Sequence, residues 1–213
     1  MNEHAEVGGA PSMAGYFHPG GRPYRFTILL FISLLTFGSY FAFDSIGALA
    51  TTLITEIHLD RGDIGSLYAA YSVAAILTVF IGGVLIDKLG TRKASLLFSV
   101  LVTVGAVIVA FSPNKSTLFA GRLIFGAGSD SLVVAQSAII SRWFKGKEMA
   151  LAFGIALTLS RLGTLFSFNT EQLIAANYGG FRAALWAAAA LCGFSLLCNL
   201  VFNAMDKRGE RML

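Results

Sequence analysis

Long apolar runs separated by short polar junctions dominate the chain from Phe26 onward. We expect six such segments, at roughly 26–49, 64–86, 94–112, 118–140, 150–172 and 183–204. Each run is about 20 residues long, the length an α-helix needs to cross a bilayer. The junctions contain Gly, Pro or charged residues, which interrupt helices. The pattern predicts an all-α membrane protein with a six-helix transmembrane bundle at 26–204.

The two ends of the chain differ from this bundle. Residues 1–25 are rich in Gly and Pro and have no apolar core, which predicts a disordered cytoplasmic tail and not a cleaved signal peptide. Residues 205–213 form a short basic end. Cys192 and Cys198 both lie in the last apolar run, which favours buried small side chains over a disulfide or a metal site.

Lys and Arg near the segment ends divide unequally between the two sides of the membrane. One side holds Arg22, Arg25, Lys88, Arg92, Lys93, Arg142, Lys145, Lys147, Lys207, Arg208 and Arg211, and the other holds Arg61, Lys115 and Arg182. Because positive residues concentrate on the cytoplasmic side, we expect both termini in the cytoplasm. Membrane orientation thus explains the formal net charge of +4, with no need for a nucleic-acid partner.

Two charged residues fall near the middle of predicted helices, where each costs roughly 2.5 to 3.5 kcal/mol to insert. Asp130 lies about twelve residues into the fourth segment and Arg161 about eleven into the fifth, so their depths are similar. They either neutralise each other as a structural pair or separate to hold a zwitterionic ligand. In the second case Arg161 suits a carboxylate and Asp130 suits an ammonium group.

Polar and small residues recur at three- and four-residue spacing on three helices, which places each set on one helix face. The sets are Ser33, Thr36, Tyr40, Asp44 and Gly47; Tyr68, Tyr71, Ala75, Thr78 and Gly82; and Gly154, Thr158, Arg161, Thr164, Phe168 and Gln172. They either line a cavity or reflect close helix packing through small residues. The candidate substrate-binding residues are Asp130, Arg161, Tyr40, Asp44, Tyr68, Tyr71 and Thr164. A gating or structural hydrogen bond suits Asp44 equally well.

The sequence carries no motif of a soluble enzyme. Its three histidines are scattered, no Cys or acid lies at metal-ligand spacing, and no glycine-rich phosphate loop precedes a helix. We therefore expect no enzyme activity, no cofactor and no metal ion.

The junction between the second and third segments carries a motif. Gly83, Asp87, Lys88, Gly90 and Arg92 follow the pattern G-x-x-x-D-[RK]-x-G-[RK]-[RK], with Thr91 at the first closing basic position. This motif resembles the loop signature of the major facilitator superfamily. Its acid and bases can form a conformational lock, made of ion pairs to neighbouring helix ends that break when a transporter changes state.

The fourth segment carries a second, weaker pattern of the same superfamily. Leu118, Arg122 and Gly126 resemble its L-x-x-x-R-x-x-x-G sequence. We expect a structural or coupling role for Arg122 and Gly126.

Further stretches resemble the lysosomal dipeptide transporter group of that superfamily, at 38–44, 121–136, 143–148, 160–164 and 206–211. The resemblance implies alternating-access transport of dipeptides or small peptides out of an acidic organelle. It also implies contacts of Asp130 and Arg161 with the peptide's termini, and a glycosylated single-span accessory protein. The tail shows no acidic dileucine sorting signal, so the plasma membrane or another membrane is the alternative to the lysosome.

Transporters of this superfamily have two six-helix halves with the substrate site between them. The chain corresponds to the N-terminal half, so we expect a missing C-terminal half or a second copy to complete the cavity. The alternatives are a regulatory half without transport of its own, or a carrier of another small organic solute. Because an Asp130 already paired with Arg161 would titrate poorly, uniport fits at least as well as proton symport.

Overall fold

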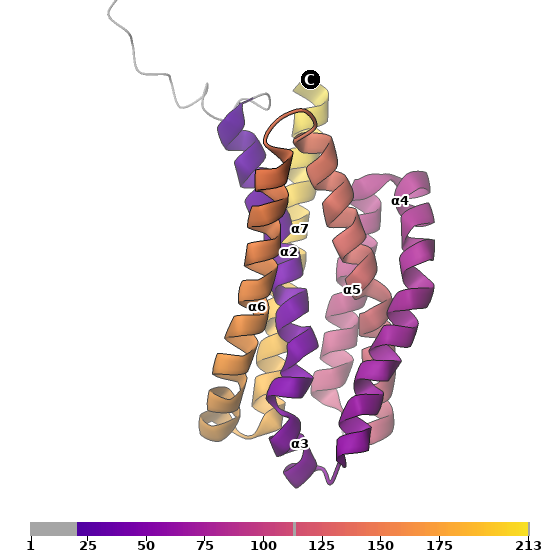
Figure 1. The fold of residues 1–213 in the computed structure, drawn as a ribbon, viewed down its shortest axis with the longest axis vertical. Helices are drawn as coiled ribbons and strands as arrows, with labels where there is room; N and C mark the ends of the chain where they lie inside the picture. The colour runs from indigo at the N-terminus through magenta and orange to yellow at the C-terminus, as the bar shows by residue number, and fades with distance from the viewer. Residues whose placement is uncertain (1–20, 113, 213) are drawn as a thin grey trace, which may run out of the picture.

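The computed structural model of the chain describes residues 21–112 and 114–212. Most of the predicted tail, residues 1–20, therefore lies outside the described residues. The helices are α2 (Arg22–Ala48), α3 (Ala50–Glu56), α4 (Arg61–Phe111), α5 (Lys115–Trp143), α6 (Met149–Tyr178) and α7 (Phe181–Met212). The long helices lie side by side, the short α3 covers one end, and α2 begins at the same end at which α7 finishes (Figure 1).

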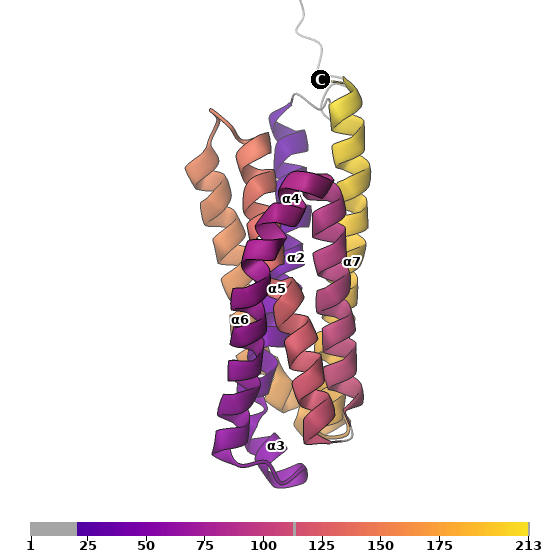
Figure 2. The same ribbon diagram turned by 90° about the vertical axis from the view of Figure 1, so that its right-hand side faces the viewer.

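Five helices, α2, α4, α5, α6 and α7, are long and apolar enough to cross a membrane. This count differs from the six segments expected because α4 joins the second and third segments in one element of 51 residues. A straight helix of that length would extend about 76 Å, more than twice the thickness of a bilayer's hydrocarbon core. Figure 2 shows that α4 instead folds back into two antiparallel arms.

The reversal occurs at Gly90, whose φ of 79° and ψ of 159° lie outside the helical region. Only glycine adopts this conformation without strain, because a Cβ atom would clash with the backbone. The glycine of the predicted loop motif is thus the residue at which the α4 chain changes direction.

Local sequence signals set three other helix ends. Asp60 and Asp63 form a reciprocal capping box at the start of α4, and the Asn114 side chain accepts a hydrogen bond from the Thr117 N–H at the start of α5. The C-terminus of α6 is closed by Gly179 in the left-handed conformation.

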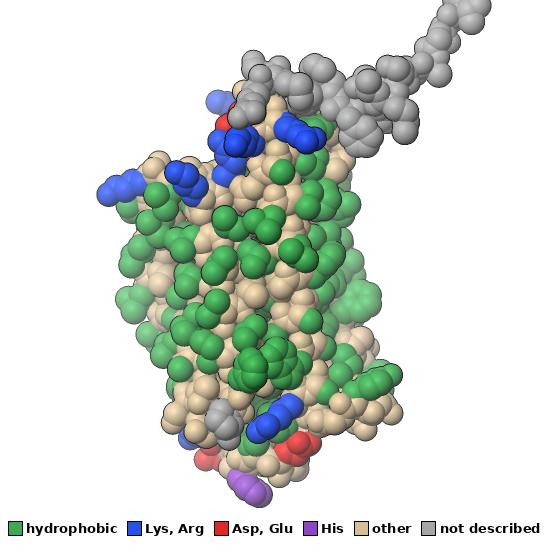
Figure 3. Space-filling view, turned by 180° about the vertical axis from the view of Figure 1, so that it is seen from behind, with side chains coloured by type: hydrophobic (Ala, Val, Ile, Leu, Met, Phe, Trp, Pro, Cys, Tyr) green, Lys and Arg blue, Asp and Glu red, His purple; other side chains and the backbone are tan. Residues whose placement is uncertain are grey.

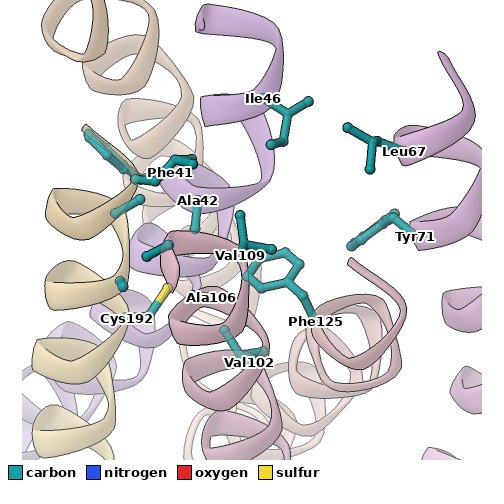
Figure 4. Packing of buried hydrophobic residues seen from close by; sticks show 14 of the residues in the cluster. Phe41, Ala42, Ile46, Leu67, Tyr71, Val102, Ala106, Val109, Phe125 and Cys192 are labelled. Atoms are coloured by element: carbon teal, nitrogen blue, oxygen red, sulfur yellow. The ribbon is translucent and has the colours of Figure 1, made fainter. Parts of the chain in front are cut away.

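A buried apolar cluster joins α2, α4, α5 and α7 in the interior. Figure 4 shows Phe41 and Ile46 of α2, Leu67 and Tyr71 of α4, and Phe125 of α5 packed around this core. The outer surface is also apolar: hydrophobic side chains cover the middle of the face in Figure 3, and Lys and Arg gather toward its ends. A surface of this kind matches a lipid environment flanked by water.

Apolar side chains are exposed on several helices, and among them the first arm of α4 and α6 present long uncovered faces. The apolar residues exposed on the first arm of α4 are Val73, Ile76, Leu77, Phe80, Ile81 and Val84. Those on α6 include Leu157, Leu165, Phe166, Phe168 and Leu173, and α6 is the least buried of the five long helices. Lipid or another apolar helix must cover these faces in a membrane.

Candidate substrate-binding site

A cavity of about 260 Å³ lies near the middle of the long helices. Its lining residues are Tyr40, Phe43, Tyr71, Ser129, Asp130 and Arg161, contributed by α2, α4, α5 and α6. The volume is slightly below the range of roughly 300–1,000 Å³ that is common for complete small-molecule pockets. Half of the lining residues are aromatic, and its two charged residues have opposite sign.

Asp130 is positioned by close packing between α4 and α5. The phenol of Tyr71 donates a hydrogen bond to Asp130 Oδ1 at 2.7 Å. One turn earlier on α5, a Cβ atom added to Gly126 would lie 2.5 Å from the Tyr71 carbonyl oxygen, so the two helices touch backbone to backbone here. The missing side chain of Gly126 therefore brings Tyr71 within reach of the carboxylate.

Arg161 is positioned by a comparable contact between α6 and α2. Its guanidinium lies over the ring of Tyr40, 5.2 Å from the ring centroid. Two residues later, a Cβ atom added to Gly163 would lie 2.3 Å from the Phe37 carbonyl oxygen. A 2.7 Å hydrogen bond between Thr36 and Ser160 adds to this close approach.

Asp130 and Arg161 face the same cavity but form no ion pair within 4.0 Å in the described part of the chain. The carboxylate has a phenol as its partner, whereas the guanidinium has an aromatic face. The two charges are therefore not paired with each other in this structure. Both charges remain available to a ligand in the cavity.

The other predicted binding residues lie outside this lining. Tyr68 packs edge-on against Phe43, with ring centroids 5.3 Å apart, and Asp44 is half-buried one turn beyond Tyr40 on α2. The hydroxyl of Thr164 is buried and has no hydrogen-bond partner among the described residues.

Sequence reasoning missed two lining residues, Phe43 and Ser129. Phe43 follows Tyr40 by three residues and so belongs to the same helix face, but an apolar side chain does not stand out in an apolar segment. Ser129 precedes Asp130 and shares a 2.8 Å hydrogen bond with Ser39 of α2.

Arg122 does not line the cavity and is 1% exposed. Its guanidinium carbon lies 5.3 to 5.5 Å from four ring centroids, those of Phe43, Tyr68, Tyr71 and Phe125. Its Nη1 donates to the Phe43 carbonyl oxygen at 3.3 Å, which ties α5 to α2. Arg122 thus supports the same Tyr71 that holds Asp130.

An ion-pair network lies at the end of the bundle where α2 begins and α7 finishes. Arg92 Nη2 lies 2.6 Å from Glu210 Oε2, and Arg92 Nε lies 3.6 Å from Asp206 Oδ2. Arg142 pairs with the same two acids, and Trp143 Nε1 donates to Asp206 Oδ1 at 2.7 Å. The network joins the second arm of α4 to the ends of α5 and α7.

Arg92 is the residue of the predicted lock that takes part in this network. Asp87 and Lys88 are exposed and form no ion pair with any described residue, and Gly83 has open space where a Cβ would lie. The acids that pair with Arg92 belong to the 206–211 stretch. In the sequence, this stretch stands out only by its resemblance to the transporter group, and its pairing with Arg92 was not predicted.

The profile of the Major Facilitator Superfamily matches residues 32–210. Among curated proteins, the chain is similar to the lysosomal dipeptide transporter MFSD1 of Danio rerio, with 37% identity over 89% of this chain and 44% of that protein. It is also similar to the Homo sapiens protein of the same name, with 33% identity over 96% of this chain and 48% of that protein. The chain thus spans about half the length of these relatives.

The fold is similar to a crystal structure of a mutant of the peptide transporter POT in complex with sulfate. The TM-score is 0.71 at 20% identity, over 84% of this chain and 37% of the other. This likeness concerns the fold alone. Together with the profile match over most of the chain, it leads to one assignment: this multi-pass membrane protein belongs to the Major Facilitator Superfamily.

Proposed function

We propose that the chain forms one half of a dipeptide carrier in which Asp130 binds the ammonium group of the substrate and Arg161 binds its carboxylate. The observation that carries this proposal is the separation of the two charges: both line one cavity, yet each has its own aromatic partner. The names of the curated relatives, lysosomal dipeptide transporters, support the choice of substrate.

The chemistry of the lining suits a zwitterion with an apolar middle. A carboxylate accepts hydrogen bonds from an ammonium group, and a guanidinium offers a planar pair of donors to a carboxylate. Tyr40, Phe43 and Tyr71 offer apolar rings to the substrate side chains between these ends. In the complete carrier, Asp44, Tyr68 and Thr164 would form further contacts or a gate beside this cavity.

We propose six membrane crossings, with the two arms of α4 each crossing once and both termini in the cytoplasm. A second six-helix unit, from a longer form of this protein, another chain or a second copy, would cover the uncovered faces of α4 and α6 and complete the cavity. Alternating access would then be controlled by the 83–92 loop, whose exposed Asp87 and Lys88 are free to pair with that unit.

We place the carrier in the lysosomal membrane with a glycosylated single-span partner, the plasma membrane being the alternative. We also propose uniport, because the fixed charges of the cavity already match both charges of a zwitterion. Uptake that strictly requires an imposed proton gradient would contradict uniport.

The test uses the protein in liposomes and compares a labelled dipeptide with the same dipeptide carrying a C-terminal amide. Arg161→Gln removes charge-assisted hydrogen bonds worth roughly 1.5 to 3 kcal/mol, so we expect dipeptide affinity to fall about 10- to 150-fold. The dipeptide amide has no carboxylate that could bind Arg161, so the affinity for the amide should change little in this variant. Arg182→Gln, at an exposed arginine beside Phe181, is the matched control. Equal losses for both ligands would contradict the assignment of Arg161.

A non-transporting half is the second candidate, favoured by the uncovered apolar faces and by the half-length match to the relatives. In that case the chain alone gives no uptake, and adding a C-terminal six-helix half restores it. Unchanged uptake of a neutral solute after Asp130→Asn and Arg161→Gln would instead indicate a carrier for another small organic molecule.

A further inference from the structure

Glu171 of α6 is a carboxyl group for which the proposed transport mechanism has no use. Its side chain is 0% exposed, and neither carboxyl oxygen has a hydrogen-bond partner among the described residues. It lies on the buried stripe of α6, which packs against α2 (Figure 1). Ser167, one turn earlier, is also 0% exposed, and its hydroxyl likewise has no partner.

No charge compensates Glu171. The titratable and charged residues on neighbouring helices toward the α3 end of the bundle are Tyr40 and Asp44 on α2, Glu56 on α3, Lys115 and Arg122 on α5, and Arg182 and Cys192 on α7. None of these forms an ion pair or a hydrogen bond with Glu171 in the described part of the chain. An ionised carboxylate that is neither solvated nor paired is far costlier to bury than a neutral carboxyl group.

Several other polar groups of the α2–α6 interface have hydrogen-bond partners, whereas the carboxyl group of Glu171 and the hydroxyl of Ser167 have none among the residues that the structure describes. Thr36 and Ser160 share a hydrogen bond of 2.7 Å, and Gln172 donates to the Ala48 carbonyl oxygen at 2.8 Å. An apolar residue at position 171 would pack in this interface without the desolvation cost. The carboxyl group of Glu171 therefore does not stabilise the contact between α2 and α6.

We propose that Glu171 is a proton-binding site that carries its proton in this conformation. A proton needs no additional room, unlike a hydrated metal cation, and this suits a side chain with no exposed surface. Ser167 and Glu171 lie four residues apart on one helix, so their side chains are neighbours. After a small rotamer change, the protonated carboxyl group can donate a hydrogen bond to the Ser167 hydroxyl oxygen.

The location gives this site a conformational consequence. Glu171 lies seven residues from the end of α6 at Tyr178, about 10 Å along the helix axis. Movement of α6 away from α2 would admit water to the carboxyl group, which would then release its proton. The one bond broken is the O–H bond, and the proton passes to water. Because the proton can return to the side it came from, pH-dependent movement does not require symport.

Infrared spectroscopy of the protein in lipid at neutral pH tests protonation without relying on transport. We expect the carbonyl stretch of a protonated carboxyl group, its loss in Glu171→Gln, and its retention in Glu56→Gln, an exposed glutamate on α3. Absence of this band from the unaltered protein, or its persistence in Glu171→Gln, would overturn the proposal. If Glu171→Gln does not fold, Glu171→Asp decides: a band shifted in frequency supports the site, and an unmoved band overturns it.

A thiol probe tests the conformational consequence. Ser167→Cys places a cysteine one turn from Glu171, and its reactivity is compared with that of the double variant Ser167→Cys, Glu171→Gln at each pH. We expect the ratio of the two reactivities to rise with pH, because only the first protein gains a buried negative charge. A ratio that stays constant would refute pH-dependent opening at this interface.

Discussion

The contact of Gly163 with α2 offers a sharp test of how Arg161 is positioned. A Cβ atom at position 163 would lie 2.3 Å from the Phe37 carbonyl oxygen and 3.3 Å from the Phe41 nitrogen. Ordinary contact begins near 3.4 Å, so Gly163→Ala requires a relative shift of about 1 Å between two helix backbones. Helix backbones cannot relieve this contact by changing a rotamer, as a side chain could.

Gly154, on the same helix, is the matched control because an added Cβ there meets no atom within 4 Å. Gly154→Ala should be neutral or stabilising by up to about 1 kcal/mol, since alanine loses less backbone entropy in a helix. Overpacking at Gly163 should cost roughly 1 to 3 kcal/mol. We therefore expect the two variants to differ by about 1 to 4 kcal/mol in the free energy of unfolding.

The assay is unfolding in detergent micelles, followed by reaction of a fluorogenic thiol reagent with the two native cysteines. Cys192 and Cys198 lie in α7 at 1% and 4% exposure, so they react only when the bundle opens. Equal stability of Gly163→Ala and Gly154→Ala would refute the backbone contact and, with it, the explanation of how Arg161 reaches Tyr40.

Two further substitutions test the other contacts of the bundle. Tyr71→Phe removes the hydrogen bond to Asp130 and should destabilise the protein by roughly 1 to 3 kcal/mol in the same thiol assay, because a charged acceptor loses its donor; stability equal to the unaltered protein would contradict this contact. Asp206→Asn should lower the stability because Asp206 is 0% exposed and pairs with Arg142, whereas Asp87→Asn, at an exposed acid, should not. Equal effects of these two changes would show that the network contributes nothing specific.

The sequence predicted the elements and the depth of the charges because these are local properties. Hydropathy marks the part of a helix that lies in lipid, and rise per residue then places Asp130 and Arg161 at similar depth. Hydropathy does not mark helix ends, however: α6 continues to Tyr178, where Gly179 stops it, and α7 continues through its charged end to Met212.

The partners of the charges could not be predicted, because they depend on how each helix is rotated against its neighbours. From the sequence, Asp130 and Arg161 were possible partners of each other. In the packed bundle, Asp130 instead accepts a hydrogen bond from Tyr71, and Arg161 lies over the ring of Tyr40. The isolation of Glu171 could not be predicted for the same reason, because it depends on the side chains of the surrounding helices and not on the sequence of α6 itself.

The positions of the glycine contacts explain why the two charges can remain apart. Gly126 joins α5 to α4 and fixes Asp130, whereas Gly163 joins α6 to α2 and fixes Arg161. Each charge is thus carried by its own pair of tightly packed helices, and the distance between the charges depends on how the two pairs lie relative to each other. A ligand that bridges Asp130 and Arg161 therefore binds best to the arrangement in which the distance between the two charges matches its own length. Such differential affinity is what a ligand needs in order to shift a conformational equilibrium.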